Sequence, residues 1–298
     1  VGSLGIPEFG TGFVETMLIE ANPTQFSDLV RIAGLGHGTA VWLGNAQDLI
    51  RSGKCTISSA ICCRDDIMVY LIHMGLEPGK AFKIMEFVRK NKKGSKIPED
   101  MMSTMVEQGV PQWYIDSLQK VRYMFPKAHA AAYAIDAIRL MWYKIYYPVE
   151  FYAGYFSAAP KGFDSEIVMR GKKHVYDTMM DMKKRKNELD QKDVEIYNAL
   201  MLVNEYYQRG FTFLPVDLQK SHAHKYVPEN GKIRLPFGSL PGLGETAADN
   251  IMRCRDEKEI YSIEALKREA GISKTVVEIL DRNGVLKNLT ATNQLTLF

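Results

Sequence analysis

The sequence has few cysteines, little net charge and no long apolar run. Its four cysteines form no C-x-x-C pair and have no zinc-type histidine spacing near them, which argues against a structural metal site. Four scattered thiols in 298 residues also argue against a disulfide scaffold and predict a reducing, cytoplasmic environment. No apolar stretch approaches the length of a membrane span and no signal peptide is recognisable, so no membrane partner is predicted.

The formal net charge is only +3, so any surface for an anionic partner must come from local clusters. Residues 83–96 hold six basic residues and one acidic residue, Glu86, and a second basic cluster covers Lys183–Lys186. Basic runs also occur on ordinary solvated faces, so these two permit an anionic partner without requiring one. The chain begins at Val1 in the middle of a pattern, and we expect the natural protein to be longer.

Helical periodicity dominates the chain, with apolar residues three or four positions apart and stops near Gly or Pro. Asp65 and Asp66 are predicted to open one helix, which Gly75 ends. The predicted helices cover residues 13–21, 26–34, 65–75, 79–90, 98–109, 128–147 and 149–158, two more between 164 and 210 with a polar turn at 183–193, and short helices from 240 to 289. The fold class predicted is therefore mainly α.

The sequence between Gly210 and Leu240 differs from the rest and predicts short strands. Residues 210–218 and 231–240 carry β-compatible side chains, and the turn-forming "ENG" at 229–231 separates "HKYVP" from "KIRLP". We therefore expect a small α+β region in an otherwise helical chain.

The stretch "LPGLGETAADNIMRCR" (240–255) is the most specific motif and predicts a helix–hairpin–helix. Gly242 and Gly244 let the turn approach a ligand closely, and the following helix start, with Thr246, offers free N–H groups to a phosphate. Leu243 is expected to pack between the helices, and residues 271–286 to supply a second helix pair. Such contacts reach the DNA backbone and do not read its sequence. The alternative is a plain helix–turn–helix corner.

The alanine-rich stretch 125–147 mixes two signals. Lys127 and His129 lie at the predicted helix start, and His129, Tyr133 and Asp136 recur on one face, which Arg139 continues. A cationic pair at a helix start beside a slim face suits nucleotide phosphates or a base pair. The alternative is a satisfied polar seam between helices. The aromatic residues that follow are predicted to be core: Trp142, Tyr143, Tyr146, Tyr147, Phe151, Tyr152, Tyr155 and Phe156.

Several long motifs together carry a family resemblance. They are "LGIPEFGT", "GHGTAVWLGNAQ", "CRDDIMVYLIHMGLEP", "FPKAHAAAYA", "YYPVEFYAGYF", "LPGLG" and the terminal "NQLTLF". In this order, over essentially the whole chain, the sequence resembles the C-terminal portion of the PolC-type alpha subunit of bacterial DNA polymerase III. Gly36 departs from the serine frequent in that family, and Gly12, followed by Glu15, departs from a basic position.

The resemblance implies a domain order and a division of roles. It implies a polymerase fingers domain (1–160), a helical connector (161–210), a duplex-binding domain (211–289) and a flexible tail (290–298). The family adds deoxynucleotides to a primer 3′ end with two Mg²⁺ ions held by palm aspartates, and the resemblance puts that palm upstream of this segment. The segment alone is therefore expected to be inactive. It implies nucleotide and template contacts at Lys127, His129, Tyr133 and His37.

The tail also has an expected partner. Gln294, Leu295, Leu297 and Phe298 fit the Q-L-x-L-F peptide by which bacterial polymerases dock on the sliding clamp, with the apolar side chains as anchors. The alternative is a tail folded back on its own domain. The partners implied are primer–template DNA, a deoxynucleoside triphosphate, the clamp (the beta subunit) and other replisome components.

Two rival functions remain. A helix–hairpin–helix DNA repair glycosylase also fits "LPGLGETAADNI", but such an enzyme needs a catalytic Asp shortly after the hairpin in a pocket for a flipped base. The downstream "DEKEIYSIEALKREAGIS" lacks that context. The second rival is a non-catalytic DNA-binding module.

Overall fold

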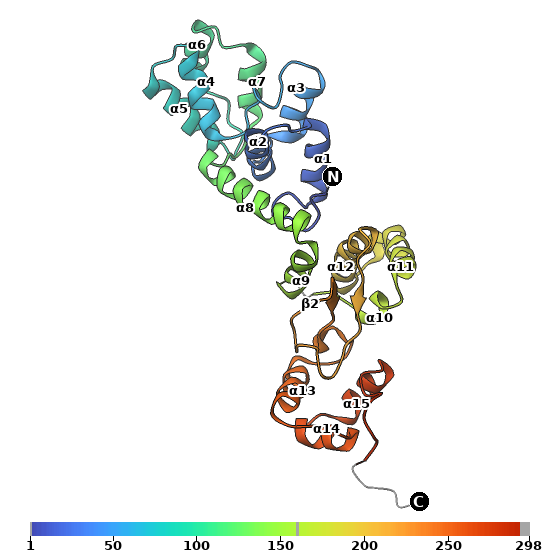
Figure 1. Cartoon of the computed structure of the whole chain (residues 1–298). Helices are drawn as coiled ribbons and strands as arrows, with labels where there is room; N and C mark the ends of the chain where they lie inside the picture. Colours follow the sequence, from blue (N-terminus) through green and yellow to red (C-terminus); the bar gives the residue numbers. More distant parts are fainter. Residues whose placement is uncertain (1, 159–160, 293–298) are drawn as a thin grey trace, which may run out of the picture. The chain divides into compact units, whose positions relative to one another are not determined.

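The computed structural model describes residues 2–158 and 161–292 (Figure 1). The chain falls into two compact units, Val1–Met141 and Trp142–Phe298, each with its own core. The division lies inside one long helix, and the predicted domain boundaries after residues 160, 210 and 289 stay predictions. Within the described residues, no helix combines the length and apolarity that crossing a bilayer requires.

The first unit is helical, as its apolar periodicity predicted. Its helices are α1 (Gly12–Ala21), α2 (Phe26–His37), α3 (Gln47–Arg51), α4 (Arg64–His73), α5 (Pro78–Arg89), α6 (Glu99–Glu107), α7 (Gln112–Lys120) and the first part of α8 (Lys127–Tyr146). A kinked turn, Trp42–Ala46, with non-helical backbone angles at Leu43 and Gly44, precedes α3. The periodicity did not indicate α3, α7 or this turn, which are short segments joined by loops.

Side chains at the helix starts explain where the helices begin. Thr11 caps α1, its hydroxyl accepting the N–H of Val14 at 3.3 Å. The Asp66 carboxylate accepts the N–H of Cys63 at 2.9 Å and so closes the start of α4. The prediction that the acidic pair at 65–66 opens a helix is therefore confirmed.

Gly34 lets α2 pack directly against the segment before α4. A Cβ at this position would lie 2.4 Å from Cys63 Sγ and 2.7 Å from the Cys62 carbonyl oxygen. Both cysteines are fully buried, and burial raises the pKa of the Cys63 thiol to about 12, so it stays protonated. All four cysteines are free thiols.

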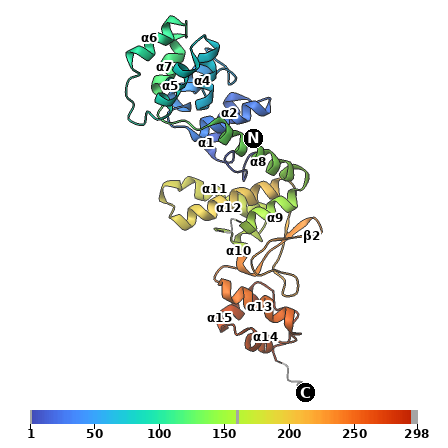
Figure 2. The same ribbon diagram turned by 90° about the vertical axis from the view of Figure 1, so that its left-hand side faces the viewer.

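The second unit combines helices with a small sheet. Its helices are the end of α8, α9 (Pro148–Ala158), α10 (Ser165–Val168), α11 (Lys172–Lys184), α12 (Gln191–Gln208), α13 (Glu245–Glu257), α14 (Ile263–Ala270) and α15 (Lys274–Arg282), with 3₁₀ turns at Lys186–Glu188 and Phe237–Ser239. Figures 1 and 2 both show α11 and α12 side by side, joined by the polar turn that the sequence predicted.

The strands lie where the β-compatible stretches predicted them. They are β1 (Phe213–Leu214), β2 (Val227–Glu229) and β3 (Lys232–Arg234), in the order β1-β3-β2. β2 and β3 are antiparallel, and β1 and β3 are parallel. The turn between β2 and β3 has Asn230 at φ 52° and Gly231 at φ 74°, backbone values that these two residue types tolerate best. The expected mainly α fold with a small α+β region is confirmed.

The prediction that all the aromatic residues from 142 to 156 are core is wrong for half of them. Phe151, Tyr152 and Phe156 are buried, and Tyr155 is partly buried. In contrast, four rings at the end of α8 and just before α9 are exposed: Trp142, Tyr143, Tyr146 and Tyr147. Trp142 contacts the other three rings at centroid distances of 5.2 to 5.3 Å. The composition showed correctly that this stretch is apolar. However, only aromatic residues of α9 are buried in the core, and the rings that precede α9 are not.

A buried polar group fastens the end of α8 to α12. Lys144, only 3% exposed at its side chain, lies with Nζ 2.6 Å from Oε1 of Glu205. The Tyr152 hydroxyl donates to the same carboxylate oxygen at 2.7 Å. Burial lowers the pKa of Lys144, and the ion pair with Glu205 opposes that effect. This network orders the second unit around α9 and α12.

Candidate functional site

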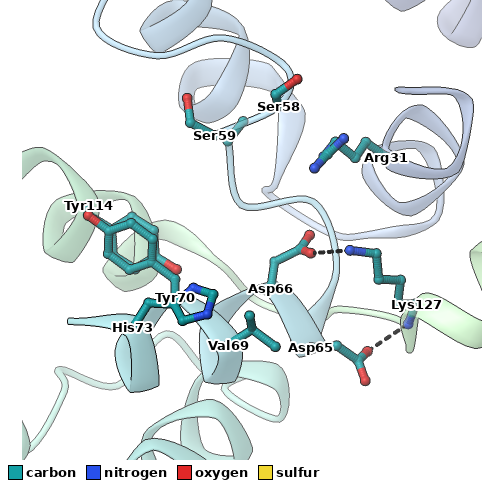
Figure 3. Close-up of a pocket in the computed structure, with 11 residues that line it drawn as sticks. Arg31, Ser58, Ser59, Asp65, Asp66, Val69, Tyr70, His73, Tyr114 and Lys127 are labelled. Carbon is teal, nitrogen blue, oxygen red and sulfur yellow. Dashed lines mark hydrogen bonds and ion pairs between the residues drawn. The ribbon is translucent and has the colours of Figure 1, made fainter. Parts of the chain in front are cut away.

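A cavity of about 290 Å³ opens in the first unit where α8 begins next to α4 (Figure 3). Lys127, the first residue of α8, donates its backbone N–H to Asp65 at 2.6 Å. Its Nζ lies 3.0 Å from Oδ1 of Asp66, and the side chain is 46% exposed. The cavity is lined by Arg31, Ser58, Ser59, Ala60, Asp65, Asp66, Val69, Tyr70, His73, Tyr114 and Lys127.

Asp65 and Asp66 are occupied by structural contacts. Asp65 receives the N–H of Lys127, and Asp66 holds both the start of α4 and the Lys127 ammonium. Within residues 2–158 and 161–292, no three His, Cys, Asp or Glu side chains lie close enough together to hold a metal ion. The resemblance puts the magnesium-binding aspartates upstream of this segment, and that stays a prediction.

Two basic and two acidic side chains line this cavity, so their charges are close to balanced. Arg31 and Lys127 supply two cations, and an anionic ligand reaching Lys127 competes with Asp66 for the ammonium. Part of the wall is aromatic: the rings of Tyr70 and Tyr114 stack with centroids 4.0 Å apart. Burial raises the pKa of Tyr114 well above its usual value, so that phenol does not ionise.

A second group of side chains gathers on the next turn of α8. The His129 ring stacks on Phe125 at 4.9 Å and meets Tyr133 at 4.7 Å. His37, at the end of α2, lies 5.4 Å from the His129 ring and 5.5 Å from the Tyr133 ring. The structure thus brings together three of the four residues predicted to contact nucleotide or template.

His37 is held by contacts on both ring nitrogens. Its Nδ1 donates to the Ala33 carbonyl oxygen at 2.6 Å, and its Nε2 lies 3.0 Å from Oε2 of Glu8. Glu8 takes a positive φ of 65°, rare for a residue with a side chain. The N-terminal segment therefore reaches this cluster through an ion pair that forms when the imidazole is protonated.

The fourth predicted residue, Lys127, belongs to the cavity and not to the imidazole cluster. The sequence reasoning placed Lys127 and His129 together because they are two positions apart, but in a helix such neighbours diverge. It also missed Arg31, Tyr70, Tyr114 and Phe125. Phe125, four residues before His129, carried a detectable spacing signal, whereas the other three come from distant segments.

Asp136 and Arg139 do not form the polar seam that was the alternative for this helix. Their side chains are 68% and 74% exposed, and Arg139 Nη1 lies 3.8 Å from Asp136 Oδ1. The face of α8 that carries them is therefore turned to solvent in this chain.

The glycine turn before α13 leaves the start of that helix exposed and without a side-chain cap. Gly242 has a φ of 85°, and Gly244 precedes α13 without a side chain to cap it. Among the described residues, the N–H groups of residues 244–247 meet no acceptor, and the first bond of this turn is Ala248 N–H to the Gly244 carbonyl. Glu245 and Thr246 are exposed there.

The turn is held rigidly against α15. Leu243 is 6% exposed, in agreement with its predicted packing, and Ala248 and Ile251 of α13 are fully buried. A Cβ on Gly242 would lie 3.3 Å from Cδ1 of Ile279 in α15. The first helix of the predicted motif is reduced to the 3₁₀ turn Phe237–Ser239.

A second glycine turn joins α14 to α15. Gly271 has a φ of 61°, and the Ser273 hydroxyl accepts the N–H of Val276 at 3.2 Å, capping α15. Residues 271–286 were predicted to supply a second helix pair, but they contain one helix, α15, and its partner α14 lies before the turn. Gln294, Leu295, Leu297 and Phe298, the residues predicted to bind the clamp, lie outside the described residues.

Comparison with protein families agrees with these two units. Residues 2–109 match the model of the bacterial DNA polymerase III alpha subunit finger domain. Residues 210–295 match a helix-hairpin-helix motif model, which covers the sheet, both glycine turns and α13 to α15.

Comparison with individual proteins extends the similarity to the whole chain. Over 297 residues the chain is 50% identical to the DNA polymerase III PolC-type of Staphylococcus saprophyticus and covers 20% of that protein. It is 47% identical over 297 residues to the DNA polymerase III PolC-type of Staphylococcus aureus, again covering 20% of it. The chain therefore spans about a fifth of the length of these relatives. The resemblance found in the motifs is confirmed for the fingers and the helix–hairpin–helix.

Proposed function

We propose that the chain is a segment of a PolC-type replicative DNA polymerase. In this role it contributes contacts to the incoming nucleotide and the template, a grip on duplex DNA, and a docking peptide for the sliding clamp. The observation that carries the proposal is the similarity along 297 residues, which includes the cavity, the imidazole cluster and the glycine turns. By analogy with a bacterial replicative enzyme, we place it in the cytoplasm.

The fingers role belongs to the first unit. The Lys127 ammonium, released from Asp66, is positioned to meet the triphosphate of a deoxynucleotide. The imidazole cluster of His37, His129 and Tyr133 offers ring faces and edges to a base pair. Chemistry on the primer 3′ end is assigned to Mg²⁺-binding aspartates elsewhere in the longer protein. Nucleotide incorporation by this chain alone would contradict that assignment.

The duplex-binding role belongs to the second unit. The free N–H groups at the start of α13 and the partial positive charge of the helix end suit a DNA phosphate. Because the ligand is a phosphate, the grip is independent of sequence and falls as salt rises.

An acidic substitution in the first turn of α13 tests this role without harming the fold. Thr246→Glu adds a negative charge where a helix dipole favours one but a phosphate does not. We expect duplex affinity to fall by about tenfold at low salt, as for the loss of one or two phosphate contacts. Fluorescence anisotropy with a labelled duplex gives the affinity, and thermal melting reports on the fold.

Gln191→Glu is the matched control, because it adds the same charge at the exposed first position of α12. It should leave duplex binding unchanged. Equal losses in both variants would show a net-charge effect and contradict the assignment to the glycine turn. Excision of damaged bases by the wild-type chain would favour the glycosylase alternative.

A further inference from the structure

A lysine-bearing loop in the first unit has more internal order than a solvated charge run requires. This loop, residues 90–96, follows α5 and is here called the lysine loop. Asn91, 7% exposed, donates from Nδ2 to the Ser95 carbonyl at 2.7 Å and accepts the Ser95 N–H on Oδ1 at 2.8 Å. Gly94 takes a φ of 71°, which completes the tight turn.

The end of α7 holds the loop from outside. Gln119 Nε2 donates to the Ser95 carbonyl at 2.9 Å, and its Oε1 accepts the N–H of Ile97 at 2.8 Å. The Arg122 guanidinium lies against Gly94, since a Cβ there would be 2.7 Å from Arg122 Cζ. Arg122 itself is fixed by donating to the carbonyls of residues 119, 120 and 121. These contacts give Lys92 and Lys93 a defined position on the surface.

Between the lysine loop and Tyr123 lies a cavity of about 340 Å³. It is lined by Thr39, Lys92, Arg122 and Tyr123, with the Lys92 ammonium 5.5 Å from the centre of the Tyr123 ring. Two cations, a hydroxyl and an aromatic ring line it, and no carboxylate does. This set of groups matches a phosphate attached to a planar base.

Further positive charges lie on the surface near the cavity. Lys93 and Lys96 are exposed and form no ion pair with an acid among the described side chains, whereas the exposed Lys83 interacts electrostatically with Glu77. The one acidic residue between 80 and 98, Glu86, is already paired with Arg89 and Lys90, and these pairs lower its pKa to about 2. The surface therefore keeps an uncompensated positive charge at neutral pH.

We propose that the lysine loop and its cavity bind single-stranded DNA. The phosphates of the strand contact Lys92, Lys93 and Lys96, and one base lies on the Tyr123 ring. A single strand fits better than a duplex because a ring in a cavity of this size stacks only on an unpaired base. The inference rests on the proposed function for the presence of an unpaired template strand, and the site is separate from the glycine turns.

Removal of the loop charges tests the proposal in the 298-residue chain. The variant Lys92→Gln, Lys93→Gln, Lys96→Gln is compared with wild type for binding a labelled oligothymidylate of about twelve nucleotides. We expect an affinity loss of about tenfold or more at low salt, and a salt slope smaller by about 2, or ~0.7 for each phosphate contact. Tyr123→Ala should also weaken binding without changing the slope, whereas Tyr123→Phe should not.

The matched control removes the same charge outside both basic clusters, by Lys172→Gln, Lys173→Gln, Lys192→Gln, at exposed lysines of α11 and α12. It should bind the oligothymidylate as wild type does. Equal loss in the control, or equal loss of duplex and single-strand binding in the loop variant, would overturn the proposal. If wild type binds duplex through the glycine turn but does not bind the single strand, the inference fails and the proposed function stands. If the wild-type chain binds neither duplex nor single-stranded DNA, the proposed function itself is contradicted.

Discussion

Lys127 has a structural role at the start of α8 and, in the proposed function, a second role as a phosphate ligand. Its backbone N–H donates to Asp65, and its ammonium forms an ion pair with the adjacent Asp66. In the proposed function, an arriving phosphate takes the place of Asp66 as a more highly charged partner of the ammonium. The exposed fraction of the Lys127 side chain, 46%, leaves it accessible to such a ligand.

We expect Lys127→Gln in the full-length polymerase to raise the nucleotide KM by about tenfold, the cost of one charge-assisted contact of roughly 1.4 kcal/mol. Steady-state incorporation at varied nucleotide concentration gives this value. Lys54→Gln, at an exposed lysine of the same unit, is the control and should behave as wild type. Unchanged kinetics in Lys127→Gln would leave Lys127 with only its structural role at the start of α8.

At the scale of elements, helix packing depends on positions where no side chain fits. Gly34 in α2 is such a position, because the backbone at residue 62 occupies the space that a Cβ needs. Gly154 in α9 differs: a Cβ there meets nothing within 4 Å. Both glycines lie inside helices, so an alanine changes helix propensity in the same way at each position. A difference in stability between the two alanine variants therefore reports the effect of packing.

Gly34→Ala is expected to lower the free energy of unfolding by about 3 kcal/mol, because the Cys62 carbonyl must move. Gly154→Ala should instead raise it by up to about 1 kcal/mol, the propensity gained by replacing glycine in a helix. Chemical denaturation of both variants measures these changes. Destabilisation of similar size in both would contradict the close approach at position 34.

The β2–β3 hairpin has a stability that depends on pH through Glu229. Hydrogen bonds from Arg234 and then from Lys220 lower the pKa of the Glu229 carboxyl to about 2. A depressed carboxyl pKa adds stability that is fully present above the unfolded value of 4.5 and is lost as pH falls toward 2. The ionised form is therefore the one that supports the hairpin.

We expect Glu229→Gln to lower the melting temperature at pH 7. The difference from wild type should shrink below pH 4.5 and disappear near pH 2, the limits set by the two pKa values. Melting curves across this range test it. Glu259→Gln, at an exposed carboxylate without an ion-pair partner among the described side chains, is the control and should melt as wild type does at pH 7. A difference that persists at pH 2 would mean that Glu229 acts through packing.

At the scale of the whole molecule, the proposed function divides the chain into several separate binding sites. The proposed nucleotide, single-strand and duplex sites lie on separate elements, and we also propose that the terminal "QLTLF" is a docking peptide for the sliding clamp. A peptide on a polar tether binds a clamp on the same DNA at a high effective concentration, so modest affinity suffices.

Deletion of Gln294–Phe298 from the full-length polymerase should abolish its stimulation by the sliding clamp and leave distributive synthesis intact. Primer extension with and without the clamp measures both activities. Leu297→Ala with Phe298→Ala should reproduce the deletion, because these side chains are the proposed anchors. Stimulation that survives the deletion would favour a tail that packs on its own domain.

The sequence alone determined the features that depend on neighbours in the chain. Most helices, the short strands, the turn at Asn230–Gly231 and the exposed glycine turn before α13 follow from periodicity and turn chemistry. The placement of Asp66 at a helix start was also predictable, because capping is local.

Only the tertiary structure decided which distant residues meet. In the structure Lys127 lines a cavity with Arg31 and lies apart from the His129 cluster. Arg122, Lys92 and Thr39 line another cavity together with Tyr123. It also left the rings of residues 142–147 exposed, although their composition indicated a core. Burial and long-range contacts arise from the packing of whole elements, and a local pattern carries no record of which face another element will cover.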